Sequence, residues 1–302
     1  MNWLLFAFSG PVLWALSTHI DKYIVERYFK HGNVAVLLIF TSLIGIVMLP
    51  FIAFYRPDIV TLDIDSILLV MLSGLLYMGA MHFYLEALQR EEASVVVPYF
   101  QVTPLFGAIL AYLLLGETLS HRQLGGGALI ILGATLLSLR FRHHHRDYKL
   151  RLLVLMLACA FAFALSSVIF TAFAIRDEFW TTAFWTYTGE VAYGAALLVI
   201  GPVRREFAAS LRTNTAAVLS INAVNEVINL GGGLGARYAL LLAPLGLVQA
   251  IGSTTPLFVF LFGVMITLLL PRFGRENLAA GNLVQKGLSA LLIVSGVLLI
   301  SA

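Results

Sequence analysis

Hydrophobic positions run along this chain in long unbroken stretches, separated by short polar connectors. Most stretches reach the length of about 20 residues that a helix needs to cross a bilayer. The connectors carry most of the charge, and no soluble domain is inserted between the stretches. The pattern therefore predicts ten membrane-spanning helices, at residues 3–24, 33–55, 65–90, 93–115, 121–140, 150–174, 180–201, 214–241, 244–270 and 283–301.

The composition fits an all-α membrane protein. Of the 302 residues, 60% are hydrophobic and only 12% are charged, whereas about a quarter of a soluble domain is charged. The net charge of +3 is explained by basic connectors facing the cytoplasm, and it gives no reason to expect nucleic-acid binding. The lone cysteine, Cys159, excludes an internal disulfide. The first apolar stretch lacks a basic start, so we interpret it as a span and not as a signal peptide.

Two halves of the chain share landmarks in the same order. The tetrapeptide Thr-Pro-Leu-Phe begins at Thr103 and again at Thr255, each time before an apolar run. Helices one to five therefore correspond to helices six to ten. Because five is odd, homologous halves must cross the membrane in opposite senses, which is an inverted-topology repeat. Chance similarity is the alternative, and the further matches that oppose it are Ala15-Leu16-Ser17 with Ala164-Leu165-Ser166, Ala87-Leu88 with Ala239-Leu240, and 128–138 with 290–301.

One stretch resembles a known family. The residues ASVVVPYFQVTPLFGAILAYLLLGETLSHRQLGGGALIILGATLL combine a proline-centred helix, a Leu-Gly-Glu turn and a glycine-rich helix. They resemble the half-repeat of the drug/metabolite transporter superfamily, EamA type. The resemblance implies one five-helix repeat at 1–142 and a second at 150–302. The second half departs from the pattern, because it reads LLLPRFGREN where the family usually repeats the Leu-Gly-Glu turn. That departure leaves a symmetric role for Glu117 in question.

The resemblance also implies a mechanism. Such a carrier works by alternating access, with a central cavity lined mainly by helices one, three, four, six, eight and nine. Its substrates are small metabolites, amino acids or drugs. The chain has no zinc-protease, nucleophile-elbow or Walker-type phosphate motif, so we expect no catalytic activity, no cofactor and only secondary transport. A membrane-embedded enzyme or lipid-modifying protein is the alternative.

The predicted eighth helix carries the clearest candidate site. Asn222, Asn225, Glu226 and Asn229 are spaced i, i+3, i+4 and i+7, which places them on one helix face. A charge within a span is unfavourable and usually faces a cavity or a partner. We therefore expect this face to line the substrate path, with Glu226 binding a proton or cation. The alternative is a polar seam between helices. Close helix packing explains the glycines that follow, at Gly231, Gly232, Gly233 and Gly235.

Five more residues are candidates for the same path. Glu190, within the predicted seventh helix, is a second coupling candidate, with a structural role equally open. Gln101 and Ser253 align between the halves, and Gln249 lies one turn before Ser253. They are candidates for hydrogen bonds to substrate, or for bonds between helices. Trp14 is a candidate aromatic wall of the cavity.

Prolines and histidines complete the candidates. Interior prolines remove a backbone donor and kink a helix, which predicts hinges or, alternatively, static kinks at Pro98, Pro104, Pro244 and Pro256. His82 and Glu86, one turn apart, suit a vestibule. The triplet 143–145 lies in the most basic connector, so we interpret it as solvated and expect no metal site.

Charge predicts the orientation. Odd-numbered connectors hold 15 Lys and Arg, and even-numbered connectors hold 4. Lys and Arg concentrate on the cytoplasmic side, which predicts both termini outside, although family members are often drawn with both inside. The expected location is the cell membrane as a multi-pass protein, with a bacterial inner membrane favoured. Expected partners are a small-molecule substrate and the lipid bilayer, with no nucleic acid, and a homodimer is left open.

Overall fold

The computed structural model describes residues 2–28, 33–57, 59, 62–90, 100, 102–138, 150–176, 178–213, 215–269 and 280–301. Over these residues the chain folds as helices joined by turns, which confirms the predicted all-α class for the described part. In chain order the helices are α1 (Asn2–Tyr28), α2 (Val34–Tyr55), α3 (Ile64–Arg90), α5 (Thr103–Leu115), α6 (His121–Ser138), α7 (Leu150–Arg176), α8 (Phe179–Val199), α9 (Gly201–Thr213), α10 (Thr215–Ala239), α11 (Leu245–Gly252), α12 (Thr255–Leu269) and α13 (Ala280–Ser301).

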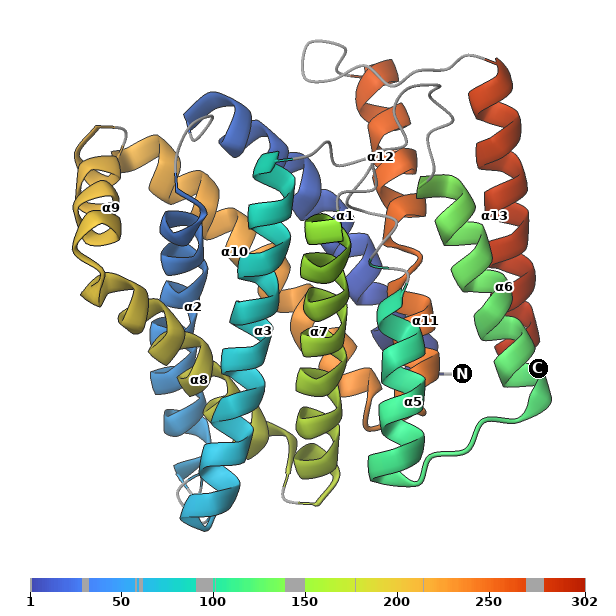
Figure 1. Cartoon of the computed structure of the whole chain (residues 1–302), viewed down its shortest axis with the longest axis horizontal. Helices are drawn as coiled ribbons and strands as arrows, with labels where there is room; N and C mark the ends of the chain where they lie inside the picture. Colours follow the sequence, from blue (N-terminus) through green and yellow to red (C-terminus); the bar gives the residue numbers. More distant parts are fainter. Residues whose placement is uncertain are drawn as a thin grey trace.

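The helices pack as a bundle in which elements far apart in sequence are neighbours (Figure 1). Helix α6 packs along α13 at one end of the molecule, and α2 packs against α8 at the other. Between them, α3 contacts both α7 and α8, while α1 contacts α10 and α12. Helix α5 contacts α7 and the short helix α11. Each of these neighbour pairs joins a helix of the first half of the chain to a helix of the second half.

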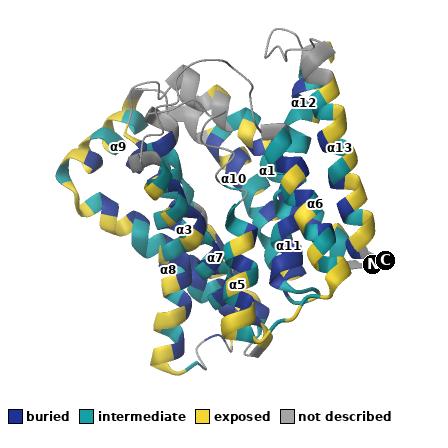
Figure 2. Ribbon diagram, turned by 45° about the vertical axis from the view of Figure 1, so that its right-hand side comes forward, coloured by how far each residue is buried: buried dark blue, intermediate teal, exposed yellow. Residues whose placement is uncertain are grey.

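The helices are suited to a lipid environment. Among the described residues, five stretches are long and apolar enough to cross a membrane. Large apolar side chains are exposed along them, and Figure 2 shows exposed residues spread along the outer helices. Such side chains are unfavourable in water but not against lipid tails. The stretches are Trp3–Ile20, Val34–Tyr55, Ile64–Ala87, Leu153–Ile175 and Leu245–Ile266.

The ninth predicted helix, 244–270, is wrong as a single helix. The structure divides it into α11 and α12, with a turn at Ser253 and Thr254. The hydroxyls of these two residues donate to the carbonyls of Ala250 and Ile251, three residues back, at 2.6 and 2.7 Å. Pro256 then lacks the N–H that a continuous helix would use. Side-chain bonding to the backbone and a proline together end one helix and start the next.

The predicted connector at 201–213 is also wrong, because these residues form the amphipathic helix α9. Its apolar face contains buried Val203 and also Phe207, whose ring lies 5.1 Å from that of Phe40 on α2. The arginines at 204 and 205 are exposed on the other side. A helix with one apolar and one basic face fits the surface of a membrane better than its interior.

Glycines allow close approach where α8 crosses α2 and α3. A Cβ at Gly194 would overlap the side chain of Ser42 on α2, and one at Gly45 would overlap Val191 on α8. A Cβ at Gly74 on α3 would collide with the backbone of α8 at the carbonyl of Thr186. Small residues permit this backbone contact, which is how helices associate in membranes.

Candidate functional site

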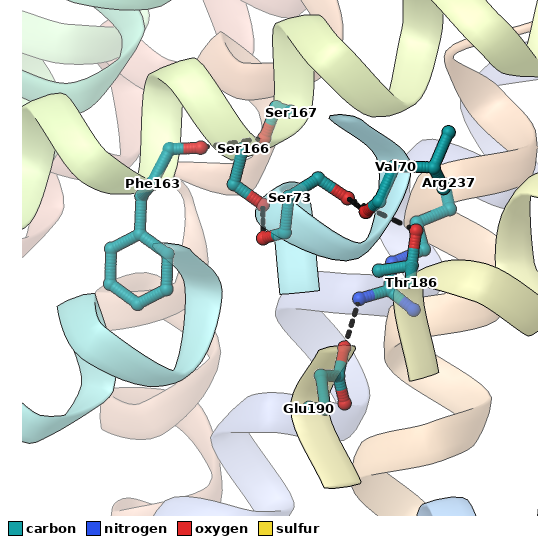
Figure 3. A network of polar contacts seen from close by, with 8 residues as sticks. All are labelled: Val70, Ser73, Phe163, Ser166, Ser167, Thr186, Glu190 and Arg237. Atoms are coloured by element: carbon teal, nitrogen blue, oxygen red, sulfur yellow. Dashed lines mark hydrogen bonds and ion pairs between the residues drawn. The ribbon is translucent and has the colours of Figure 1, made fainter. Parts of the chain in front are cut away.

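A buried ion pair joins α8 to α10. The guanidinium Nη2 of Arg237 donates to Oε1 of Glu190 at 2.7 Å (Figure 3). The side chains are 16% and 5% exposed, so water screens the pair poorly. The predicted helix 214–241 contains Arg237, but the charge count assigned this residue to an even-numbered connector. That assignment is wrong, because Arg237 lies in the last turn of α10 and its side chain reaches the interior.

Aromatic rings from three helices surround this guanidinium. Its Cζ lies 4.9 Å from the ring centroid of Tyr187 on α8, 5.4 Å from Phe170 on α7 and 5.7 Å from Tyr77 on α3. A cation over an aromatic face is stabilised by the ring quadrupole, and more strongly when water is excluded. Arg237 is therefore held by one carboxylate and by the faces of three rings.

A second buried carboxylate lies on the same helix as Arg237. Glu226 of α10 is 8% exposed, and Thr41 of α2 donates its hydroxyl to Oε1 of Glu226 at 2.9 Å. Asn222 and Asn225 are buried as well, and Nδ2 of Asn222 has no hydrogen-bond partner among the described residues. Asn229 is only partly buried. The predicted polar face of this helix therefore points largely inward, toward the first half of the chain.

Hydroxyl groups connect α3, α7 and α8 beside the ion pair (Figure 3). Ser73 of α3 shares a hydrogen bond of 3.1 Å with Thr186 of α8. Ser166 of α7 donates to the carbonyl of Ser73 at 2.7 Å. These contacts pair polar groups inside the bundle with one another, and they hold the three helices together beside Glu190.

The other candidates gather where α5 crosses α11. Gln249 lies against Gly107 so closely that a Cβ there would overlap its side-chain amide. Within the described part of the chain, its Oε1 is buried without a partner, and so is Oγ1 of Thr103, one turn before Gly107 on α5. Ser253 instead bonds to its own helix, as described above. Of the two, Gln249 is the better substrate-binding candidate, because its acceptor is unused.

Glu117 links the halves near the end of this crossing. Its Oε2 accepts the backbone N–H of Leu245, the first residue of α11, at 2.8 Å. Gly116 makes this possible, because its φ of 68° is a left-handed conformation that favours glycine. Burial raises the pKa of Glu117, and the hydrogen bond from Leu245 opposes that rise. The Leu-Gly-Glu turn of the first half thus caps a helix of the second half.

The remaining predicted residues are placed as follows. Trp14 packs on α10, where a Cβ at Gly232 would lie 3.1 Å from its indole nitrogen. Gly231, Gly232 and Gly235 therefore serve close packing against α1, as predicted, whereas a Cβ at Gly233 would meet no described atom within 4 Å. Pro104 and Pro256 lie in the first turns of α5 and α12, and Pro244 caps α11. Gln101, Pro98 and the histidines at 143–145 lie outside the described residues.

Two further features bear on the site. His82 of α3 shares a hydrogen bond of 2.7 Å with the hydroxyl of Tyr193 on α8. A cavity of about 490 Å³ lies on α12 beside Val12, with a lining of apolar residues. Neither the His82–Tyr193 hydrogen bond nor the lining of this cavity involves Glu190 or Glu226. Within the described part of the chain, no group of three or more metal-ligating side chains occurs.

Sequence reasoning missed the partners of the two carboxylates. Arg237 lies 11 positions after Glu226, which puts both on one helix face, so a longer reading of the polar pattern would have found it. Thr41, Tyr77 and Phe170 carry no comparable signal. Their roles depend on which helices become neighbours, and that is a property of the fold.

Comparisons with known proteins agree with this architecture. The model of the EamA-like transporter family matches residues 1–139. An uncharacterized protein of Methanocaldococcus jannaschii, MJ1333.1, is 30% identical over 129 residues, which are 42% of this chain and 90% of the relative. A crystal structure of a protein only 15% identical superposes with a TM-score of 0.69, covering 99% of this chain and 96% of the other. That last likeness shows a shared fold.

The apolar helices indicate a multi-pass membrane protein, and the family is one of membrane transporters. On the family match and the relative covered over nine-tenths of its length, this chain belongs to the EamA-like transporter family.

Proposed function

We propose that this protein is a secondary carrier or exporter that moves small metabolites, amino acids or drugs across the cell membrane, in a bacterial inner membrane, by alternating access. One observation carries the proposal. Two carboxylates, Glu190 and Glu226, are buried against partners in the bundle interior, where α8 and α10 meet helices of the first half. Buried ionisable groups within membrane spans mark substrate and ion pathways.

Alternating access requires two halves that exchange roles, and the packing supports such a pair at 1–142 and 150–302. If α1, α2, α3, α5 and α6 correspond to α7, α8, α10, α12 and α13, contacts come in matched sets. The pair α1–α10 corresponds to α7–α3, and α1–α12 corresponds to α7–α5. The pairs α2–α8 and α6–α13 correspond to themselves. An inverted repeat predicts such pairing around a pseudo-twofold axis.

Single residues support the same register. Ser42 and Gly45 on α2 correspond to Val191 and Gly194 on α8, 149 positions later, the offset of the Ala-Leu-Ser landmark. The contact of Gly194 with Ser42 then becomes the contact of Gly45 with Val191, and both occur. A relative less than half as long as this chain also suits a five-helix unit that was duplicated.

The same correspondence relates the two carboxylates. Thr41 matches Glu190 in this register, and Glu226 matches Gly74 in the register of the Ala-Leu landmark. Thr41 contacts Glu226, and Gly74 lies against the backbone at Glu190. Glu190 lies on the second helix of its half, where α8 crosses α3, and Glu226 lies on the third, where α10 meets α2. The correspondence between the halves exchanges these two crossings. That placement suits a site that opens alternately to either side.

Substrate contacts are proposed at the polar atoms that the fold leaves unsatisfied. An unpaired buried polar atom is unfavourable by about 1–3 kcal/mol, so a ligand that pairs with it gains binding energy. Asn222 and Gln249 each hold such an atom. Asn225, Asn229, Ser253, Gln101 and Trp14 are proposed around them, with the prolines 98, 104, 244 and 256 as hinges.

Glu226 is the proposed proton-coupling carboxylate, and Glu190 is the second candidate. The Thr41 hydroxyl that donates to Glu226 is neutral. Glu190 is instead paired with Arg237, so a proton added to Glu190 would leave a buried cation unbalanced. A carboxylate whose protonation differs between the two open states is what proton coupling requires.

The test is transport by the purified protein in proteoliposomes. A panel of labelled amino acids, organic acids and cationic drugs is offered with and without an imposed pH gradient. A carrier gives saturable accumulation of at least one compound that empty liposomes do not show. If no compound is accumulated or exchanged while substrates are chemically modified at the membrane, the protein is a membrane-embedded enzyme instead.

A further inference from the structure

Arg237 presents a charge that the proposed coupling does not use. Guanidinium groups stay protonated in proteins, so this interior site always contains a cation. Glu190 balances it through a single hydrogen bond, from Nη2 to Oε1. A guanidinium has five N–H donors in a planar fork, shaped to take both oxygens of a carboxylate. The bonds to Glu190 and to the Tyr187 hydroxyl leave further donors of the fork for another anionic group.

The surroundings of Arg237 favour a particular kind of anion. Tyr77, Phe170 and Tyr187 cover the guanidinium with ring faces from three different helices. The ring faces stabilise the cation, and the hydroxyl of Tyr187 also accepts a hydrogen bond from the guanidinium. They also provide apolar surface against which a ligand's own ring or hydrocarbon group can pack. A small inorganic anion would leave that surface unused.

A purely structural role explains the ion pair poorly. Removing two charges from water opposes most of their attraction, so a buried pair contributes little net stability compared with apolar residues of similar size. Elsewhere around Glu190, glycine and hydroxyl contacts already hold the helices together, at Gly74, Ser73 and Thr186. A charged pair adds little to that packing but provides the means to recognise a charged ligand.

Resting on the carrier function proposed above, we propose that Arg237 anchors the carboxylate of an organic-anion substrate that carries an aromatic or other apolar group. Glu190 occupies the anchor when no substrate is present, and the substrate carboxylate replaces it. The ring faces of Tyr77, Phe170 and Tyr187 receive the apolar part of the substrate.

The charges balance when the proposed proton is included. Among the described residues, the titratable or charged groups that interact with Glu190 are Arg237 from α10, Tyr77 from α3 and Tyr187 from α8. Tyr77 also interacts with Glu226 of α10, while α7 contributes the apolar Phe170. An incoming carboxylate adds one negative charge, and a proton taken up by Glu226 removes one. The displaced Glu190 is hydrated while the site is open. The net charge of the site is then the same with and without substrate.

The experiment measures the thermal stability of the full chain in detergent. Glu190→Gln removes the resident carboxylate and leaves Arg237 unpaired, so its Tm should fall below that of the unmodified protein. Sodium benzoate supplies a carboxylate on a ring and should raise the Tm of Glu190→Gln by about 5 °C or more, because it restores the pair. Benzamide, the uncharged analogue, should not.

Two control variants isolate the anchor. The double variant Glu190→Gln, Arg237→Gln removes both charges and should show no benzoate effect. Glu178→Gln makes the same change in the ion pair of Glu178 with Arg56, whose side chains are 38% and 40% exposed. Water already solvates Arg56 there, so benzoate should leave this variant's Tm unchanged.

The Tm measurements distinguish a carboxylate anchor at Arg237 from a nonspecific effect of benzoate. A rise specific to benzoate and to variants that keep Arg237 supports the anchor. No rise, or an equal rise in the double variant, overturns it. If Glu190→Gln does not fold, Glu190→Asp, which retains the charge on a shorter side chain, is measured against the same criteria. Because no transport is measured, failure here leaves the carrier function standing. A benzoate rise in a protein that transports nothing defeats the carrier and retains the binding site.

Discussion

Glu226 and Glu190 differ in their partners, a hydroxyl in one case and a guanidinium in the other. The partner decides what each carboxylate can do. A proton added to Glu190 leaves a buried cation unbalanced, whereas the Thr41 hydroxyl that donates to Glu226 carries no charge. At the scale of single residues, the two acids therefore have separate roles in the proposed cycle.

Glu226→Gln should abolish uptake driven by a pH gradient while the protein remains folded. Glutamine keeps an oxygen that can accept from Thr41 but cannot exchange a proton. Uptake into proteoliposomes is compared with and without the gradient, alongside Glu206→Gln on the surface helix α9 as control. Gradient-driven uptake that persists in Glu226→Gln at the control level contradicts the assignment.

Two glycines of α3 should respond oppositely to the same substitution. A Cβ at Gly74 collides with the backbone of α8, so Gly74→Ala forces the helices apart and should destabilise by about 1–3 kcal/mol. A Cβ at Gly79 meets nothing within 4 Å, so Gly79→Ala should stabilise by up to about 1 kcal/mol through helix propensity. Thermal unfolding in detergent measures both. Equal effects would show that the crossing of α3 and α8 is not close.

At the scale of elements, the short helix α11 depends on the first half for its start. Its N-cap residue, Pro244, makes no side-chain hydrogen bond, and Glu117 supplies the missing acceptor from the turn between α5 and α6. Six of its eight residues, 245–248, 250 and 251, are buried. The contact between the halves at this end is therefore both a cap and a packing contact, and the proposed alternating access would have to break it to open the protein here.

Glu117→Ala should destabilise the protein by about 1 kcal/mol, because α11 loses its capping acceptor. Glu117→Gln keeps an acceptor and should be affected less. Burial raises the pKa of Glu117, so protonation favours the folded state, and that contribution is lost as the pH rises through the raised value. Glutamine does not titrate, so this part of the pH slope should vanish. Unfolding measured against pH tests both points, and equal losses for Ala and Gln would refute the cap.

At the scale of the whole molecule, the structure sharpens the charge asymmetry. Arg237 lies inside the bundle, so it no longer counts among the even-numbered connectors, whose share falls from 4 to 3 against 15. Arg204, Arg205 and Arg212 belong to α9, which lies on the side of the odd-numbered connectors. A basic amphipathic helix is favoured at the anionic cytoplasmic surface.

Both termini should therefore face away from the cytoplasm. A fluorescent protein that matures only in the cytoplasm, fused after Ala302, should stay dark. The same protein inserted after Pro202, at the start of α9, should fluoresce and serves as the positive control. A bright fusion at the C-terminus would overturn this orientation and favour the one usually drawn for the family.

Sequence alone determined the helical membrane class, most helix positions and the candidate face of α10. These follow from local patterns, because the length of an apolar run and the spacing of polar residues are set within one helix. It failed at 201–213 and at 253–254, where an amphipathic helix resembles a connector and hydroxyl bonds to the backbone end a helix inside an apolar run.

Only the tertiary structure decided which groups meet. The pairing of Glu190 with Arg237, the ring faces around Arg237 and the cap from Glu117 to Leu245 join residues 47 to 160 positions apart. Electrostatic and hydrogen-bond energies depend on the distance between groups in space and on the exclusion of water. Neither that distance nor that exclusion can be predicted from the local sequence. The proposed roles of the buried charges therefore depend on which helices are neighbours in the fold.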